Sequence, residues 1–260
     1  MKIVVLVKYV PDATGERRFA ADGTVDRAGS DGLLSELDEY AVEQALQIAD
    51  EGDDVEVVAL TLGPDHAADA IKRSLQMGAS AGIHIDDDAV HGSDVLATSA
   101  ILAAAVRRAA PELVICGMAS TDGTMGVLPA MLAERLGWPG ATLGATLKLA
   151  GDTVTVRRDT DVASLTVEAK LPAIVSVTDQ SGEARYPSMK GILAAKKKPV
   201  ETWTLADLGI EAGEVGLAAA ATEVLETTPR PPREAGKVVP DEDGSGATAL
   251  VDFLATGKYI

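Results

Sequence analysis

The residues best suited to chemistry in this sequence form a loop of small polar residues near the middle of the chain. The loop covers residues 117–126, Gly-Met-Ala-Ser-Thr-Asp-Gly-Thr-Met-Gly, and follows an apolar run at 113–116. Three glycines let a ligand approach the backbone closely, and the hydroxyl groups can cap a helix behind the loop. Amides at a helix start, aided by the helix dipole, favour a phosphate group. We therefore expect an anion site with the amides of residues 121–126 as main donors, and an ordinary strand-to-helix turn is the alternative.

A helix must follow the loop if the loop amides are to converge on a ligand. Proline is tolerated in a first helical turn, where no amide hydrogen is needed, and glycine commonly ends a helix. Pro129 and Gly137 stand at these two places, and four apolar residues between them have helical spacing: Leu128, Met131, Leu132 and Leu136. The sequence thus predicts a strand, a loop and a helix in that order.

Strands and helices alternate through the first half of the chain. Apolar runs at 3–7, 55–62, 83–85 and 113–116 predict strands, and the first is unbroken, as in a central strand buried on both faces. Such alternation predicts right-handed crossovers and a parallel sheet covered on both faces. Ligands bind these sheets at the carboxyl ends of the strands, where the loop at 117–126 is expected.

The segments between these strands carry their own signals. A polar insertion follows the first strand, and Asp22-Gly23 within it predicts a small hairpin at a surface or interface. Ser35 with Asp38 predicts a capped helix start, and Ser93 predicts another.

The pattern changes after residue 139. Residues 142–149 and 154–158 alternate apolar with polar side chains and predict an antiparallel hairpin, and further strands are expected at 164–169 and 173–177. We predict an α/β fold, a doubly wound and mostly parallel sheet with helices on both faces, an added antiparallel hairpin and a C-terminal arm. The expected division is a nucleotide-binding domain at 1–210 and an arm at 211–260 that packs on a partner subunit, with a last apolar helix around residues 250–254.

The composition excludes several classes of protein. The 260 residues carry a formal net charge of −17, which repels nucleic acid and anionic membranes. A single cysteine, Cys116, allows no internal disulfide, and no cluster of metal ligands or membrane-spanning run is apparent. We expect a cytoplasmic protein that is not embedded in a membrane and holds no metal.

Side-chain catalysis is not expected. The three histidines are scattered, and no Walker loop is present. A match to the hydrolase pattern G-x-S-x-G at 78–82 lies between a helix and a strand, the reverse of the order that this motif needs. A match to a dinucleotide pattern at 244–249 follows no strand.

A basic stretch at 185–198 reverses the local charge of this acidic chain. It holds no carboxylate and five cations, namely Arg185, Lys190, Lys196, Lys197 and Lys198. Cations can simply complement the dipole at a helix end, which is the alternative for the three consecutive lysines. Met189, among small and polar residues, is expected to be exposed.

Together these residues resemble the beta subunit of the electron transfer flavoproteins over about residues 1–210. The resemblance rests on the start of the chain and seven further motifs: Lys2 to Lys8 with Pro11-Asp12, Glu39-Tyr40-Ala41-Val42-Glu43, Gly63-Pro64, Leu75-Gln76-Met77-Gly78-Ala79, Thr121-Asp122-Gly123, Leu171-Pro172-Ala173, Arg185-Tyr186-Pro187 and Ala195 to Lys198. It implies a heterodimer whose alpha subunit holds most of the FAD, while this subunit buries an AMP. Such a complex takes electrons from acyl-CoA and related dehydrogenases, as in fatty acid oxidation, and passes them to a membrane quinone oxidoreductase. No bond is made or broken by this chain.

The resemblance also implies where the ligand and partners bind. The AMP contacts fall on Leu6, Ser35, Glu36, Leu37, Asp38, Leu62, Gly117, Met118, Ala119, Ser120, Thr121, Asp122, Gly123, Thr124, Met125, Gly126, Val127 and Leu128. The docking residues for dehydrogenases fall on Tyr186, Pro187, Met189, Lys190, Ile192, Lys196, Lys197 and Lys198, with Met189 as the apolar anchor. Many relatives have Lys-Gln where this chain has Met118-Ala119, so contacts from those two side chains are not carried over.

Three alternatives remain open from the sequence. An electron-bifurcating relative would hold a second FAD in place of AMP. A stand-alone adenine-nucleotide sensor would need neither the basic stretch nor the apolar arm. An ATP-pyrophosphatase-type ligase would need a Ser-Gly-Gly loop after the first strand, where this chain has Lys8-Tyr9-Val10-Pro11.

Overall fold

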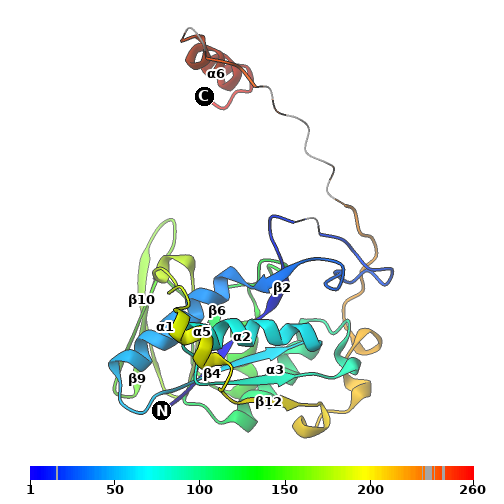
Figure 1. Ribbon diagram of the computed structural model, residues 1–260, viewed down its shortest axis with the longest axis vertical. Helices are drawn as coiled ribbons and strands as arrows, with labels where there is room; N and C mark the ends of the chain where they lie inside the picture. The colour runs from blue at the N-terminus through cyan, green and yellow to red at the C-terminus, as the bar shows by residue number, and fades with distance from the viewer. Residues whose placement is uncertain (16, 230, 232–235, 237, 242–243) are drawn as a thin grey trace. The chain divides into compact units, whose positions relative to one another are not determined.

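The computed structural model describes residues 1–15, 17–229, 231, 236, 238–241 and 244–260. They divide into two units, Met1–Glu226 and Thr227–Ile260. The first unit is built on a seven-stranded sheet with the order β12-β5-β4-β1-β6-β11-β7, in which every neighbouring pair is parallel (Figure 1). Its strands are β1 (Lys2–Leu6), β4 (Glu56–Leu62), β5 (Ala81–Ile85), β6 (Leu113–Gly117), β7 (Gly140–Gly144), β11 (Ala173–Val177) and β12 (Val200–Trp203).

Strand β1 is central, as its unbroken apolar run predicts. Ile3 and Val5 belong to one hydrophobic cluster, whereas Val4 and Leu6 belong to another, because alternate side chains of a strand point to opposite faces of the sheet. Helices α1 (Glu36–Glu51) and α2 (Ala68–Met77) cover the first face, and α3 (Val95–Ala109) and α4 (Leu128–Leu136) cover the second. The doubly wound α/β fold is therefore confirmed.

Two expected helix caps are wrong. Ser35 precedes α1, but its hydroxyl makes no capping bond, and the carboxylate of Asp38 accepts a hydrogen bond from the backbone of Lys8 instead. Helix α3 is capped by Asp94, whose carboxylate accepts from the amides of Leu96 and Ala97. Ser93 instead accepts from the amide of Gly216, a bond between residues far apart in the sequence, which local patterns cannot indicate.

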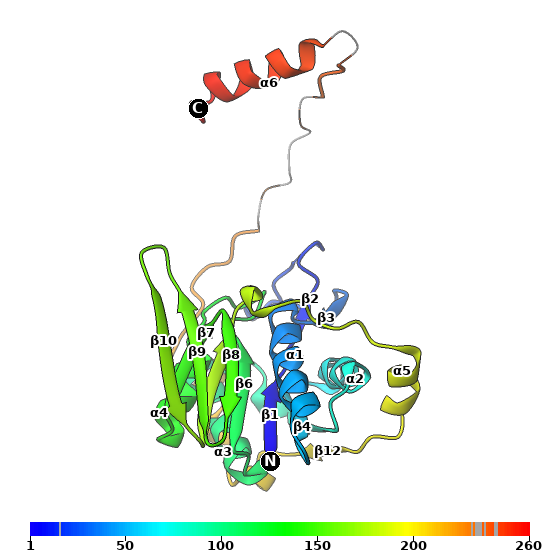
Figure 2. The same ribbon diagram turned by 90° about the vertical axis from the view of Figure 1, so that its left-hand side faces the viewer.

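The expected hairpin belongs to a separate antiparallel sheet. Strands β8 (Thr146–Ala150), β9 (Thr153–Asp159) and β10 (Ser164–Lys170) pair in the order β10-β9-β8 (Figure 2). The run at 142–149 is divided, because its first residues lie in β7 and pair with β11 before the chain leaves the parallel sheet near Leu143, which has φ 63°.

The polar insertion after β1 has paired ends. Strands β2 (Tyr9–Pro11) and β3 (Gly32–Leu34) are antiparallel, a pairing that the sequence analysis did not predict. Within the insertion, Phe19 and Val25 form an antiparallel bridge around the predicted turn at Asp22-Gly23. Figure 2 shows the insertion at the end of the sheet toward which β1 runs, which is the carboxyl edge.

The last segments of the first unit extend beyond the expected boundary at residue 210. Helix α5 (Met189–Ala195) packs against α2 and leads to β12. Residues 211–226 bond to the start of α3, where Leu217 donates to the carbonyl of His91 and Ala221 donates to Asp94. The second unit contains α6 (Ser245–Thr256), on which the predicted apolar residues fall; residues 230, 232–235, 237 and 242–243 of the expected arm lie outside the described residues.

Candidate functional site

The expected ligand residues gather at the carboxyl edge of the parallel sheet. Leu6 and Leu62 end the adjacent strands β1 and β4, residues 35–38 begin α1, and residues 117–128 run from the end of β6 into α4. Gly117 lies against Leu37 and Asp38, since a Cβ atom at Gly117 would stand 2.6 Å from the Asp38 carboxylate. The fold thus brings the three groups to one edge, as expected for a doubly wound sheet.

Asp38 ties these groups together. Its carboxylate accepts from the amide of Lys8 at 2.9 Å and from the backbone of Gly117, so one buried side chain joins α1 to the ends of β1 and β6. Burial disfavours the charged form and raises the pKa of Asp38 to about 7, although both amide bonds act in the opposite direction. This carboxyl group therefore titrates near neutral pH in the folded protein.

We expect replacement of Asp38 by asparagine to change how stability depends on pH. The folded protein binds the Asp38 proton more tightly than the unfolded chain, whose pKa is near 3.8, so this contribution to stability is complete below about pH 4 and is lost as the pH rises through 7. The advantage of the native protein over Asp38→Asn should shrink by on the order of 1 kcal/mol per pH unit across this window. Urea unfolding at pH 5, 6, 7 and 8 measures it, and parallel curves for the two proteins would contradict it.

A second carboxylate, Asp122, organises the loop. Its side chain is 1% exposed; one oxygen accepts from Lys8 Nζ at 2.9 Å and the other from the guanidinium of Arg27. Burial opposes ionisation, but the charge and hydrogen bond of Lys8, with further help from Ser120 and Arg27, hold the pKa of Asp122 well below its usual range. The loop is therefore held by an ionised, doubly paired aspartate.

The loop hydroxyls do not cap α4, so that expectation is wrong. Val127 occupies the cap position and provides no side-chain bond. Ser120 acts inside the loop instead: its hydroxyl accepts from the amide of Gly123 at 3.3 Å, and its carbonyl accepts from that of Thr124 at 3.0 Å. Pro129 and Gly137 lie where the sequence predicts, in the first turn of α4 and directly after its end.

Two buried hydroxyls at the same edge have no hydrogen-bond partner. They belong to Ser35 at the start of α1 and to Thr61 in β4, and each residue is at most 1% exposed. An unpaired buried hydroxyl is costly, and native structures seldom leave one without a partner. With the cations Lys8 and Arg27 beside the loop, the donor set fits a small molecule that carries hydroxyl or ring-nitrogen groups and an anionic group.

The remaining expected ligand residues differ in exposure. Several loop residues are accessible, with Met125 63% exposed, and Leu6 is buried. The sequence analysis missed Lys8 and Arg27. Lys8 could have been found, because it follows the first strand at the carboxyl edge, but nothing in the sequence around Arg27 indicates its distant partner.

The expected docking residues lie on and beside α5. Met189 is 74% exposed, as the sequence predicts, and Tyr186 is 87% exposed with the guanidinium of Arg73 over its ring. Lys190, Lys196 and Lys197 are also exposed. These residues present apolar and positively charged groups together on one surface.

Three members of the basic stretch do not belong to that surface. Pro187 is buried, and Arg185 forms ion pairs with Glu43 and Asp50 of α1. Lys198 donates to the carbonyls of Leu75 and Gly78 at the end of α2. Arg185 and Lys198 thus attach the segment to the helices beneath it, and a docking role for Pro187 and Lys198 stays a prediction.

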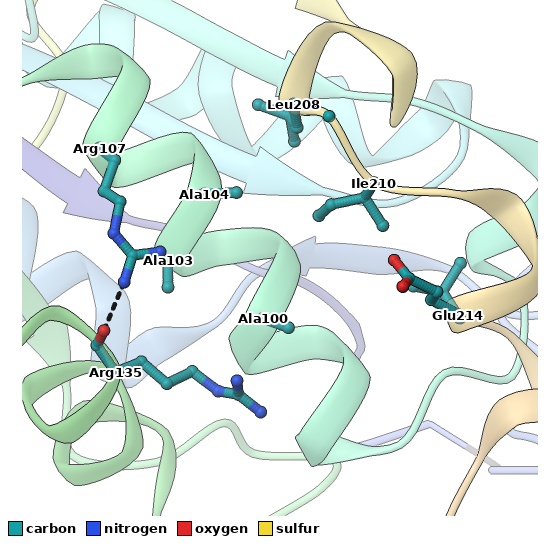
Figure 3. Close-up of a pocket in the computed structure, with 10 residues that line it drawn as sticks. Ala100, Ala103, Ala104, Arg107, Arg135, Leu208, Ile210 and Glu214 are labelled. Carbon is teal, nitrogen blue, oxygen red and sulfur yellow. Dashed lines mark hydrogen bonds between the residues drawn. The ribbon is translucent and has the colours of Figure 1, made fainter.

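Two cavities lie apart from the loop at 117–126. One of about 420 Å³ lies between α3 and residues 208–215, where Arg107 of α3 donates to the carbonyl of Arg135 of α4 (Figure 3). Another of about 600 Å³ lies between β3 and α2, and Glu36 is among its lining residues. The described residues of the loop line neither of these two cavities.

The described part of the chain offers little support for a metal site, a reactive thiol or a membrane-spanning helix. No group of three or more possible metal ligands is found there. The lone cysteine, Cys116, is buried in β6, and burial together with the nearby Asp38 raises the pKa of its thiol. None of the described helices is both long and apolar enough to cross a membrane.

The fold and the position of the site define a doubly wound α/β protein with a ligand edge at the carboxyl ends of its strands. Comparison with known proteins is more specific. Residues 22–208 match the electron transfer flavoprotein domain, and the chain belongs to the electron transfer flavoprotein family. Beta subunits of this family are electron carriers and not enzymes.

The relatives match the whole chain. An electron transfer flavoprotein subunit beta from Mycobacterium leprae is 47% identical over 99% of both chains. One from Megasphaera elsdenii is 31% identical over 97% of this chain and 96% of its own. An acryloyl-CoA reductase electron transfer subunit gamma from Anaerotignum propionicum is 31% identical over the full length of both. These similarities confirm the family resemblance, and a beta subunit implies an alpha subunit with which it forms a heterodimer.

Proposed function

We propose that this chain binds AMP at the carboxyl edge of its sheet and, with an alpha subunit that holds most of the FAD, carries electrons. The donors are acyl-CoA and related dehydrogenases, and the acceptor is a quinone oxidoreductase in a membrane. The flavin supplies the redox chemistry when bound, since it can take up and release electrons. This chain contributes no bond-making step.

The observation that supports AMP best is the grouping at the sheet edge. A glycine-rich loop there is flanked by the cations Lys8 and Arg27, which suit a phosphate, and by the unpaired hydroxyls of Ser35 and Thr61, which suit an adenosine. Lys8 Nζ also lies 3.3 Å from the hydroxyl of Ser120.

The nucleotide content of the purified protein tests this proposal. We expect one AMP per heterodimer on denaturation, one FAD, and no stoichiometric FAD from this subunit expressed alone. The alternative within the family is an electron-bifurcating beta subunit, and the similarity to a reductase-associated subunit makes it worth testing. Two FAD per heterodimer and no AMP would favour that alternative.

The arm and the cellular compartment are also proposals. The second unit exposes Leu250, Val251 and Phe253 on α6, each more than half exposed, and we assign this apolar surface to contact with the alpha subunit. The strongly acidic composition and the redox partners suit the cytoplasm.

We expect Met189→Ala to weaken docking on the dehydrogenases. An unbranched, flexible side chain can fill imperfect pockets on several partners, and exposed lysines around it steer an acidic partner toward it. Truncation should cost about 1–3 kcal/mol of docking free energy and leave nucleotide content unchanged. Electron transfer from a reduced acyl-CoA dehydrogenase at several ionic strengths measures it. Leu165→Ala, at an exposed apolar residue of β10, is the control, and equal rates for both variants would exclude this docking site.

A further inference from the structure

The side chain of Arg27 connects the polar insertion to the loop at residues 117–126, which we call the nucleotide loop. Arg27 lies in the described part of the insertion, residues 17–31, and its guanidinium donates to the carboxylate of Asp122, 95 residues later in the chain. The other oxygen of Asp122 accepts from Lys8, which follows the end of β1. Two cations from different segments therefore meet on one carboxylate of the loop.

The burial of Asp122 makes this junction stiff. Its side chain is 1% exposed, whereas those of Arg27 and Lys8 are 30% and 42% exposed. A buried carboxylate that loses one of its cations is left partly uncompensated, which is much costlier than the loss of an exposed ion pair. The loop cannot move away from the insertion without breaking this pairing.

The insertion is held at a second place, away from the loop. Nε2 of His91 lies 2.7 Å from the carboxylate of Asp22, and Gly23 lies so close to Val224 that an added Cβ would stand 3.3 Å from that side chain. Residues 22–23 thus contact other parts of the first unit. Arg27 reaches the loop from a segment that has a second contact of its own.

We infer that Arg27 is a positioning residue that holds the nucleotide loop closed and slows release of the nucleotide. This inference rests on the proposed binding of AMP at this edge. Lys8 and Arg27 together exceed the charge of Asp122 by one, so the junction remains favourable to an anionic phosphate although the whole chain carries −17. Arg27 acts through Asp122 and the loop, and contact with the nucleotide is not required.

Exchange of labelled AMP from the purified heterodimer tests the inference. We expect Arg27→Ala to release AMP on the order of 10-fold faster or more, as for other truncations of a paired charge. Arg27→Lys should release AMP more slowly than Arg27→Ala but faster than the native protein, because an ammonium replaces the charge but not the planar donor group. Arg17→Ala is the matched control, since it removes the same charge from an exposed side chain of the same insertion.

A second measurement separates this inference from the proposed function. The rate of amide hydrogen exchange at residues 120–126 measures how firmly the pairing of Arg27 with Asp122 holds the loop, whether or not AMP is present. Faster exchange in Arg27→Ala than in Arg17→Ala supports the inference even if the native protein contains no AMP, a result that would reject only the proposed AMP site. If the two variants show equal amide exchange, or release AMP equally fast, the positioning role is overturned.

Discussion

Gly117→Ala is expected to destabilise the protein by about 3–5 kcal/mol, because it overfills a packed junction and displaces a buried carboxylate. The new Cβ would stand 2.6 Å from an Asp38 oxygen and 2.8 Å from the carbonyl of Leu37. Neither atom can yield easily, since Asp38 bonds to the backbone on both sides and Leu37 lies in the first turn of α1. Nucleotide retention should fall with stability, since the loop begins at this residue.

Gly123→Ala is the control for this prediction. A Cβ atom at Gly123 would meet only the flexible ends of Ser120 and Lys8, at 3.3 and 3.7 Å. It should cost less than about 1 kcal/mol, in the range of an ordinary surface substitution. Urea unfolding of both variants gives the comparison, and equal losses would mean that the junction at Gly117 adapts.

The second large effect concerns Arg185. Its guanidinium donates to both oxygens of Glu43, at 2.7 and 3.1 Å, and to Asp50 at 2.8 Å. Although burial of Glu43 favours its neutral form, these bonds outweigh burial and lower the pKa of Glu43. Arg185→Ala would leave a carboxylate that is only 7% exposed without its cation, although Gln47 and the backbone amide of residue 185 would still donate to it. We expect a loss of about 2–3 kcal/mol, reduced from the value for a fully buried pair because Arg185 is partly exposed.

The same change should also impair docking. Arg185 attaches the start of the docking segment to α1, so its removal frees the residues that lead to Met189. Thermal unfolding and electron transfer from a dehydrogenase measure the two effects. Lys197→Ala removes an exposed cation of the same segment and should leave stability unchanged; an Arg185→Ala variant as stable as Lys197→Ala would contradict the anchoring role.

Much of the fold follows from local signals. The unbroken apolar run of β1 requires a central strand, and α4 starts and ends where Pro129 and Gly137 predict. The edge at which the ligand residues gather follows from the alternation of strands and helices, which depends on short stretches of sequence.

The interactions that shape the site could not be predicted in the same way. The carboxylate of Asp38 bonds across 30 residues to Lys8, that of Asp122 across 95 residues to Arg27, and that of Glu43 across 142 residues to Arg185. In the sequence, Asp38 predicts a helix cap, because an acidic residue three positions after a serine commonly has that local role. In the structure its carboxylate instead accepts from Lys8, a bond that depends on tertiary packing.

The route of the chain through the docking segment has a consequence for proteolysis. The segment connects β11, near one side of the parallel sheet, to β12 at its opposite edge, and it passes over α2 on the way (Figure 2). Strand β12 pairs along β5, whose residues are largely buried and apolar. After a single cut near Met189, β12 would be held by the rest of α5, which packs against α2, by its own pairing and by its downstream contacts. If β12 then separated, the backbone edge of β5 would be uncovered, and uncovered edges of this kind promote aggregation.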